Sequence, residues 1–262
     1  MPKIDLGEQN RIEEGKEAFF QLWGKPIFNS KHSVKCGIVY FSGQDTTLLL
    51  DTFNETSKKL KVKFEAIKVK AGTYDSRKGL EMLSEAIGKA AEREGCNICL
   101  IILPNQLKTQ YKKLKTAALL KYKIICQMTT EATLRKQNLR SIATKILLQI
   151  IAKRGNTLWV PKSPEGVKGA MMIAFETAKA GKMTTLGMCA TLNSTFSSIF
   201  SRCESYCDND KKFSTMLNLT LKAVEGYAHR NKEPPAEVVL FNSSASNDQI
   251  KLFKELFTIP LK

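Results

Sequence analysis

The chain has 262 residues, 43% of them hydrophobic, which is enough for two domains of ordinary size that each bury a core. Lysine and arginine number 41 against 25 acidic residues, and the net charge of +16 favours a polyanionic partner, nucleic acid before an anionic membrane surface. No run approaches the ~18 apolar residues of a membrane helix, and the amino terminus lacks a signal-peptide core. These features argue against a disordered tail or a membrane protein and predict a cytoplasmic or nuclear protein.

The first part of the chain alternates between strand-like and helix-like patterns. Residues 1–33 are charged and loosely patterned, and we expect a linker segment there with a helical patch at 12–23. From residue 34 we expect strands near 36–41, 61–69 and 97–103, and helices near 46–59 and 76–93. Such alternation predicts an α/β domain with a parallel sheet covered by helices on both faces.

A first group of polar residues follows the strand expected at 97–103. Residues 104–115 begin with Pro104, which suits a first helical position, and continue as a helix. Tyr111 and Lys115 are four residues apart, so in a helix they lie on one face.

A second group follows in residues 141–155. Apolar residues recur there at helical spacing until Gly155, and Gln149 and Lys153 share one face of the predicted helix. Between the two helices Gln127 lies in a short apolar run without helical period. We therefore expect its amide at a strand end, where it can donate to an anion.

In this order and spacing the five polar residues resemble the guide-binding site of the Argonaute/PIWI family, PIWI branch. The resemblance covers roughly residues 34–262 and implies a Rossmann-like MID domain at 34–160. In that family the MID domain anchors the 5′ phosphate of a small guide RNA. The resemblance implies that the ring of Tyr111 stacks on the first base, and that the phosphate is surrounded by the side chains of Lys115, Gln127, Gln149 and Lys153.

The resemblance carries two further expectations for this site. A Mg²⁺ ion at the guide phosphate is implied, because two lysines do not fully neutralise a terminal phosphate. Residues 116–126 occupy the place of the loop that selects the first base. A single exposed Lys or Tyr is by default a solvated side chain, but five such residues in the family's spacing reverse that default.

After residue 161 the pattern changes. We expect three strands near 168–176, 184–191 and 196–206, then a helix near 213–229, a strand near 236–241 and a helix from 248. This order opens an RNase H-like fold, and the resemblance implies that residues 161–262 form a partial PIWI domain of that kind.

Guided cleavage of RNA in this family uses divalent ions held by carboxylates. Alignment with the family's catalytic strands places Glu176 at the first Asp, Ser243 at the second Asp and Lys211 at the mobile Glu. Asp208 and Asp210 are close to Lys211 in the sequence, so a small shift in the alignment would place either of them at the position of the mobile Glu. These three substitutions imply a degenerate catalytic site, because Glu176 is one methylene longer than Asp, Ser243 offers only a hydroxyl and Lys211 is a cation. We then expect Glu176 to be a surface carboxylate at a strand end.

The seven cysteines suit free, buried thiols better than a disulfide framework. Cys96 and Cys99 have the spacing of metal ligands, as do Cys203 and Cys207, but the first pair borders an apolar strand, which favours structural thiols. Neither GxGxxG nor GxxxxGK[ST] occurs, which removes most support for nucleotide hydrolysis.

The sequence thus predicts a module that binds a small guide RNA through its 5′ phosphate in RNA-directed gene silencing, without slicer activity. Its expected partners are the guide RNA and a target transcript, with no membrane. Two alternatives stay open. One is a guide-directed RNA endonuclease completed by further residues, and the other is a guide-free scaffold whose incomplete PIWI domain docks a protein partner.

Overall fold

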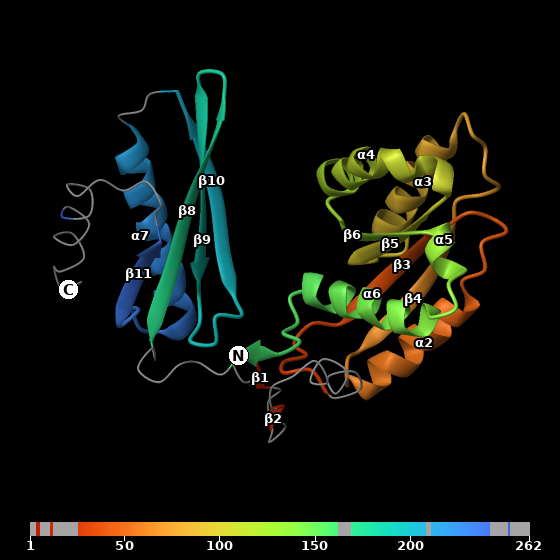
Figure 1. Cartoon of the computed structure of the whole chain (residues 1–262), viewed down its shortest axis with the longest axis horizontal. Helices are drawn as coiled ribbons and strands as arrows, with labels where there is room; N and C mark the ends of the chain where they lie inside the picture. The colour runs from red at the N-terminus through yellow and green to blue at the C-terminus, as the bar shows by residue number, and fades with distance from the viewer. Residues whose placement is uncertain are drawn as a thin grey trace. The chain divides into compact units, whose positions relative to one another are not determined.

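The computed structural model describes residues 26–161, 169–207 and 211–241, together with Lys251 and two short strands, β1 (Ile4–Asp5) and β2 (Arg11–Ile12). The chain divides into two compact units, Met1–Val160 and Pro161–Lys262, each with its own core (Figure 1). Within the described part, no helix is long and apolar enough to cross a membrane.

The first unit is built on a four-stranded parallel sheet in the order β4-β3-β5-β6. Its strands are β3 (Val34–Tyr40), β4 (Phe64–Lys70), β5 (Ile98–Leu103) and β6 (Ile125–Thr130). Every residue of β5 is buried, as its unbroken apolar sequence requires of a central parallel strand covered on both faces. The parallel sheet expected from the alternating pattern is confirmed.

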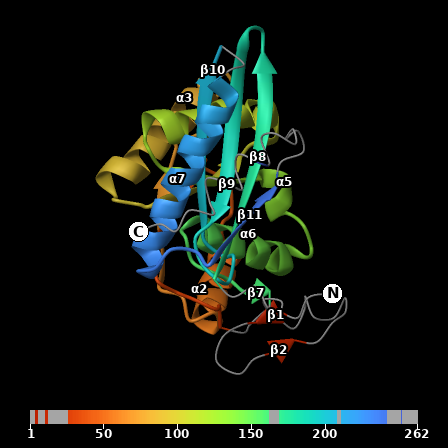
Figure 2. The same ribbon diagram turned by 90° about the vertical axis from the view of Figure 1, so that its left-hand side faces the viewer.

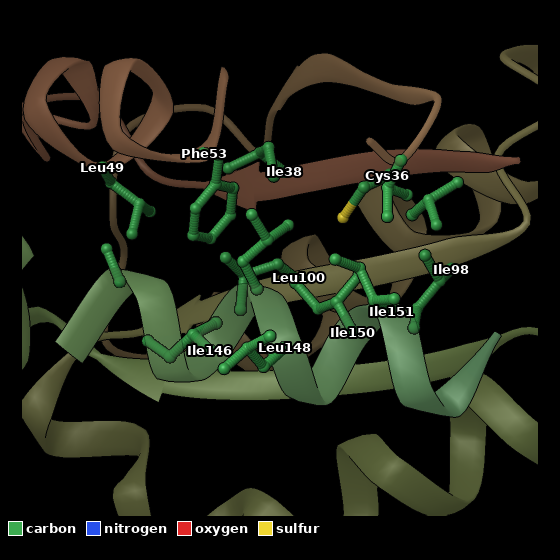
Figure 3. Packing of buried hydrophobic residues seen from close by; sticks show 14 of the residues in the cluster. Cys36, Ile38, Leu49, Phe53, Ile98, Leu100, Ile146, Leu148, Ile150 and Ile151 are labelled. Atoms are coloured by element: carbon green, nitrogen blue, oxygen red, sulfur yellow. The ribbon is translucent and has the colours of Figure 1, made fainter. Parts of the chain in front are cut away.

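Helices cover both faces of this sheet (Figure 1). They are α2 (Thr47–Lys59), α3 (Gly79–Gly88), η1 (Lys89–Arg93), η2 (Asn105–Gln110), α4 (Tyr111–Thr116), η3 (Ala117–Lys121), α5 (Glu131–Leu134) and α6 (Leu139–Lys153). On one face, α2 and α6 pack Phe53 and Ile150 against Ile38 and Leu100 (Figure 3). On the other face, α3, η1 and α4 enclose a second cluster. Two apolar layers on one sheet explain why the unit is a sandwich of helix, sheet and helix.

Gly37, inside β3, sets the close approach of η1 to the sheet. A Cβ atom on Gly37 would lie 2.8 Å from the Cβ of Ala90 and 3.3 Å from the Sγ of Cys96. Any larger residue would force the π-helical turn away from the sheet, so the glycine is required for packing rather than for a turn.

The seven cysteines are all free. Four are buried in the first unit, as expected, and burial raises the pKa of the Cys36 and Cys99 thiols. The expectation of burial is wrong for Cys189, Cys203 and Cys207 of the second unit, which are exposed.

Hydrogen bonds join the segment before β3 to the residues that follow α6. The backbone N–H of Thr157 donates to Asn29 O and that of Asn29 to Thr157 O, both at 3.0 Å. The Asn156 side chain accepts from His32 N and donates to His32 O, both at 2.9 Å. β1 and β2 join β7 (Val160–Pro161) in a small sheet. The helical patch expected at 12–23 lies outside the described residues except for Ile12, which is in β2.

The second unit is a four-stranded sheet in the order β10-β9-β8-β11. Its elements are β8 (Ala170–Ala180), β9 (Met183–Thr191), β10 (Ile199–Tyr206), α7 (Lys211–Asn231) and β11 (Glu237–Phe241). The first three strands form an antiparallel meander, and β11 returns parallel to β8 after α7. α7 lies against β9 and β10 (Figure 2) and buries Leu219 and Ala223 on one face of the sheet.

The predicted order of three strands, a helix and a strand is therefore confirmed. β8 runs past the expected end at residue 176 to Ala180, because its pairing with β9 continues to the turn at Gly181. The helix expected from residue 248 lies outside the described residues, except that Lys251 is helical.

Candidate functional site

Hydrogen bonds join three of the five predicted site residues between β6 and α6. The Nζ atom of Lys153 donates to Gln127 Oε1 at 2.7 Å and to the backbone oxygen of Cys126 at 2.9 Å. The Nε2 atom of Gln127 donates to Gln149 Oε1 at 2.8 Å. Gln149 and Lys153 lie one helical turn apart on α6, so both reach the same part of the strand.

Gln127 does not lie at a strand end, so that part of the prediction is wrong. It is the third residue of β6 and pairs with Leu100 in β5. Pairing continues to Thr130, because Thr129 and Thr130 are β-branched and extend the strand alongside Leu103. The Gln127 amide therefore projects from within an edge strand toward α6.

Tyr111 and Lys115 lie on one face of α4, as their spacing predicts. The Lys115 Nζ atom is 5.9 Å from the centroid of the Tyr111 ring, within the range of a cation–π interaction. Both side chains are exposed, and Leu114 between them is buried and anchors the helix to the core. Pro104 precedes the first helical residue instead of being that residue, and the helix begins as the 3₁₀ segment η2.

The charges of Lys115 and Lys153 act on each other and on Cys126 of β6. Desolvation against the protein lowers the pKa of Lys153, the Cys126 thiol opposes this, and the nearby charge of Lys115 adds to the lowering. Burial raises the pKa of the Cys126 thiol, and the charges of Lys153 and Lys115 act against that rise. Lys153 thus bonds to residues 126 and 127, the charge of Lys115 acts on Cys126 from a different helix, and among the described residues neither lysine forms an ion pair.

Residues 116–126, expected in the place of a base-selecting loop, are largely regular. Thr116 ends α4, η3 continues the helix as a π-helical turn to Lys121, and only residues 122–124 link it to β6. Leu119 and Leu120 on η3 are 55% and 63% exposed. The expectation of a loop, taken from the family resemblance, did not anticipate this helical turn or its exposed apolar side chains.

The positions aligned with the catalytic carboxylates lie in the second unit. Glu176 is exposed and lies within β8 opposite Gly187, not at the strand end, and its Oε1 accepts a hydrogen bond from Thr177 N at 3.3 Å. Lys211 is the first residue of α7. Ser243, Asp208 and Asp210 lie outside the described residues. Among the residues that are described, no group of three or more His, Cys, Asp or Glu side chains could hold a metal ion.

Comparison with known proteins identifies the family. The model of the Piwi domain matches residues 98–256, more than half of the chain. The chain belongs to the Piwi domain family. The matched region begins with β5 in the first unit and continues through the second unit.

Curated relatives of this Piwi-family chain agree with that assignment. Protein piwi of Drosophila melanogaster is 26% identical over 198 residues, covering 72% of this chain and 22% of that protein. Piwi-like protein 1 of Danio rerio is 24% identical over 208 residues, covering 78% of this chain and 23% of that protein. The chain spans less than a quarter of the length of these two relatives.

Solved structures share the fold. The crystal structure of Drosophila Piwi matches with a TM-score of 0.76 at 20% identity, covering 98% of this chain and 36% of that one. The MID-PIWI domains of N. crassa QDE-2 AGO match with a TM-score of 0.66 at 12% identity, covering 87% and 68%. The predicted fold class, a Rossmann-like MID domain followed by a partial RNase H-like PIWI domain, is confirmed.

Proposed function

We propose that this Piwi-family chain binds a small guide RNA through its 5′ phosphate, as part of RNA-directed gene silencing. The supporting observation is the hydrogen-bonded group of Lys153, Gln127 and Gln149 between β6 and α6, where the charge of Lys115 also acts on Lys153, with no ion pair to either lysine among the described residues. Two cations brought together without carboxylate partners repel each other, and a bound phosphate relieves that repulsion.

The same residues account for recognition of an RNA end. Hydrogen bonds from ammonium groups to phosphate oxygens are about twice as strong as neutral ones. The exposed ring of Tyr111 offers a surface on which the first base stacks, worth ~1–3 kcal/mol. Contacts to a phosphate and to the face of a base carry little sequence information, so the module recognises the end of the RNA more than its sequence. The sequence of the target transcript is then read by base pairing.

We further propose that the chain does not cleave RNA. Two-metal cleavage needs anionic ligands on both ions. By alignment, only Glu176 of the three substituted positions retains a carboxylate, whereas Lys211 carries a positive charge and Ser243 a hydroxyl. The endonuclease alternative predicts Mg²⁺-dependent cutting of a paired target, which a gel assay with a labelled target RNA would reveal.

A Mg²⁺ ion at the guide phosphate stays a prediction from the family resemblance. The described side chains do not fit an ion held by the protein alone, because Gln127 Oε1 and Gln149 Oε1 already accept hydrogen bonds and neither carries charge. Such an ion would take its ligands from phosphate oxygens and water. No step of the proposed binding depends on it.

The experiment that tests the proposal compares one short RNA bearing either a 5′ phosphate or a 5′ hydroxyl. The two are titrated into the purified protein at the same salt and Mg²⁺ concentrations. Tighter binding of the phosphorylated RNA is expected. Equal affinities would mean that only the general positive charge binds RNA, and would favour a guide-free scaffold that docks a protein partner.

A further inference from the structure

A cavity of about 440 Å³ lies against α3 and η1, and none of the five predicted guide-binding residues lines it. Its charged lining comes from Lys70 of β4, Glu85 of α3, and Lys89, Glu92 and Arg93 of η1. The volume is within the range of cavities that bind ligands in proteins.

Two π-helical turns border this cavity. The backbone N–H of Glu94 donates to Lys89 O at 3.2 Å, and that of Tyr122 donates to Ala117 O at 3.3 Å. Each turn delivers a residue to the lining, since Lys89 begins η1 and Tyr122 directly follows η3. Such turns are frequent at functional sites.

The ring of Tyr122 is held against α3. A Cβ atom on Gly88 would lie 2.6 Å from Cε1 of Tyr122, so the ring packs directly on the glycine backbone. The Tyr122 hydroxyl is 3.3 Å from Oγ of Ser84. Lys121 Nζ lies 4.9 Å from the centroid of the same ring, within the range of a cation–π interaction. The cavity therefore includes an aromatic side chain that already attracts a cation.

Two carboxylates line the cavity together with this ring. Glu85 and Glu92 are three residues before and four residues after Gly88, so they share its side of the helix. The hydrogen bond to Tyr122 raises the pKa of Lys121 most, and the charges of Glu85 and Glu92 add to that rise. Among the described residues neither carboxylate forms an ion pair. This side of the cavity favours a cation.

The other charged residues of the lining are cations. Lys89 and Arg93 are the first and last residues of η1, and Lys70 is the last residue of β4. In the part of the chain that the structure describes, none of the three forms an ion pair. The cavity thus offers unpaired charges of both signs to a bound group.

We propose that this cavity binds a segment of a protein partner in which an arginine lies close to an acidic residue. A guanidinium group stacks on an aromatic ring and forms paired hydrogen bonds with a carboxylate, and it takes the place of Lys121 at Tyr122. The acidic residue meets Lys89 and Arg93. Charges of both signs fix the orientation of such a segment, whereas Glu85 and Glu92 repel the phosphates of RNA. The proposal is independent of guide binding.

The test uses the full chain and a tripeptide of arginine, leucine and glutamate with blocked ends. A matched peptide carries citrulline, which has the shape of arginine without its charge. Binding is followed through the backbone amide chemical shifts of Gly88 and Tyr122. The arginine peptide is expected to shift both signals and the citrulline peptide to shift neither. An equal response to the two peptides, or no response at millimolar concentration, would overturn the proposal. Shifts produced only by a short single-stranded RNA would assign the cavity to nucleic acid instead.

Charge variants give a second readout. Glu85→Gln and Glu92→Gln are each expected to weaken binding of the arginine peptide about fivefold, since each removes a partly screened charge beside the guanidinium group. Glu81→Gln makes the same change at an exposed position of α3 outside the lining, and should leave the affinity unchanged.

Lys121→Ala distinguishes a cation site from an anion site. It removes the cation that competes for the Tyr122 ring, and is expected to tighten binding of the arginine peptide about threefold. Amide signals away from the cavity should stay in place in every variant, which verifies the fold. Weaker binding in Lys121→Ala, or equal losses in the three glutamate variants, would overturn the proposal.

Discussion

Replacing Lys153 by alanine is the most direct perturbation of the proposed site. Lys153 supplies one of the two ammonium groups proposed to bind the phosphate, and two of its N–H groups are already used within the protein. One N–H therefore remains for a phosphate oxygen, beside the longer-range attraction of the charge. Lys153→Ala removes this N–H donor and the attraction of the charge, and it also removes the hydrogen bond from Lys153 to Gln127 Oε1.

The expected loss of RNA affinity follows from the single N–H of Lys153 that remains for a phosphate oxygen. One hydrogen bond to a charged group contributes about 1.5–3 kcal/mol, and each 1.4 kcal/mol is about tenfold in affinity. Because much of the Lys153 side chain is exposed, we expect the lower end of that range, a loss of about tenfold for the 5′-phosphorylated RNA. The free energy of unfolding should change by less than about 0.5 kcal/mol, since water can replace a surface ammonium group.

The assay is the paired titration of phosphorylated and hydroxyl RNAs, with Lys113→Ala as a matched control. Lys113 is an exposed lysine of α4, two residues from Lys115 and so turned away from its face. Lys113→Ala therefore removes one positive charge from the protein, as Lys153→Ala does, but leaves the side chains of the proposed site unchanged. The control is expected to weaken both RNAs slightly and equally, whereas Lys153→Ala and Lys115→Ala weaken the phosphorylated RNA selectively.

One result would refute this reasoning. If Lys153→Ala lowered the affinity for both RNAs by the same factor as Lys113→Ala, the lysine would act only through the net charge. The group of Lys153, Gln127 and Gln149 between β6 and α6 would then have no role in recognising the 5′ end.

Three further outcomes are expected. Because desolvation lowers the pKa of Lys153, phosphate-dependent affinity should fall at a pH below the ordinary range of lysine, and Lys153→Arg, which stays charged, should move that fall to higher pH; superimposable pH profiles would contradict this. Tyr111→Ala should cost about fivefold or more in affinity for RNA and Tyr111→Phe very little, as measured by titration, and equal losses would argue against stacking. Gly37→Ala should destabilise the first unit by about 1–3 kcal/mol in chemical denaturation, since its Cβ would meet Ala90 at 2.8 Å, whereas Gly226→Ala, with 3.7 Å to its nearest neighbour, should not destabilise the second unit.

Part of the site could be read from the sequence because the α-helix has a fixed period. Tyr111 and Lys115, like Gln149 and Lys153, are one turn apart, and the structure places each pair on one helical face. The apolar run of β5 likewise indicated a strand buried on both faces. These features depend on residues that are close together in the sequence, and the regular geometry of a helix or a strand fixes how such residues lie.

Other features depend on pairing between distant segments. The place of Gln127 within β6 follows from its register with β5, and no local signal near residue 127 fixes where that pairing ends. The helical form of residues 117–121 was not predicted, because resemblance to a loop of the family says little about the local backbone.

The sequence by itself determined the family and the alternating order of strands and helices, and it supplied the hypothesis of which residues bind a terminal phosphate. Only the tertiary structure decided that Lys115 and Lys153 act on the same thiol, and that Gln127 points its two polar ends at Lys153 and Gln149. The reason is physical. Side-chain identity and helical spacing are local properties, whereas electrostatic coupling and the direction of a hydrogen bond depend on distances across the sheet that only packing sets.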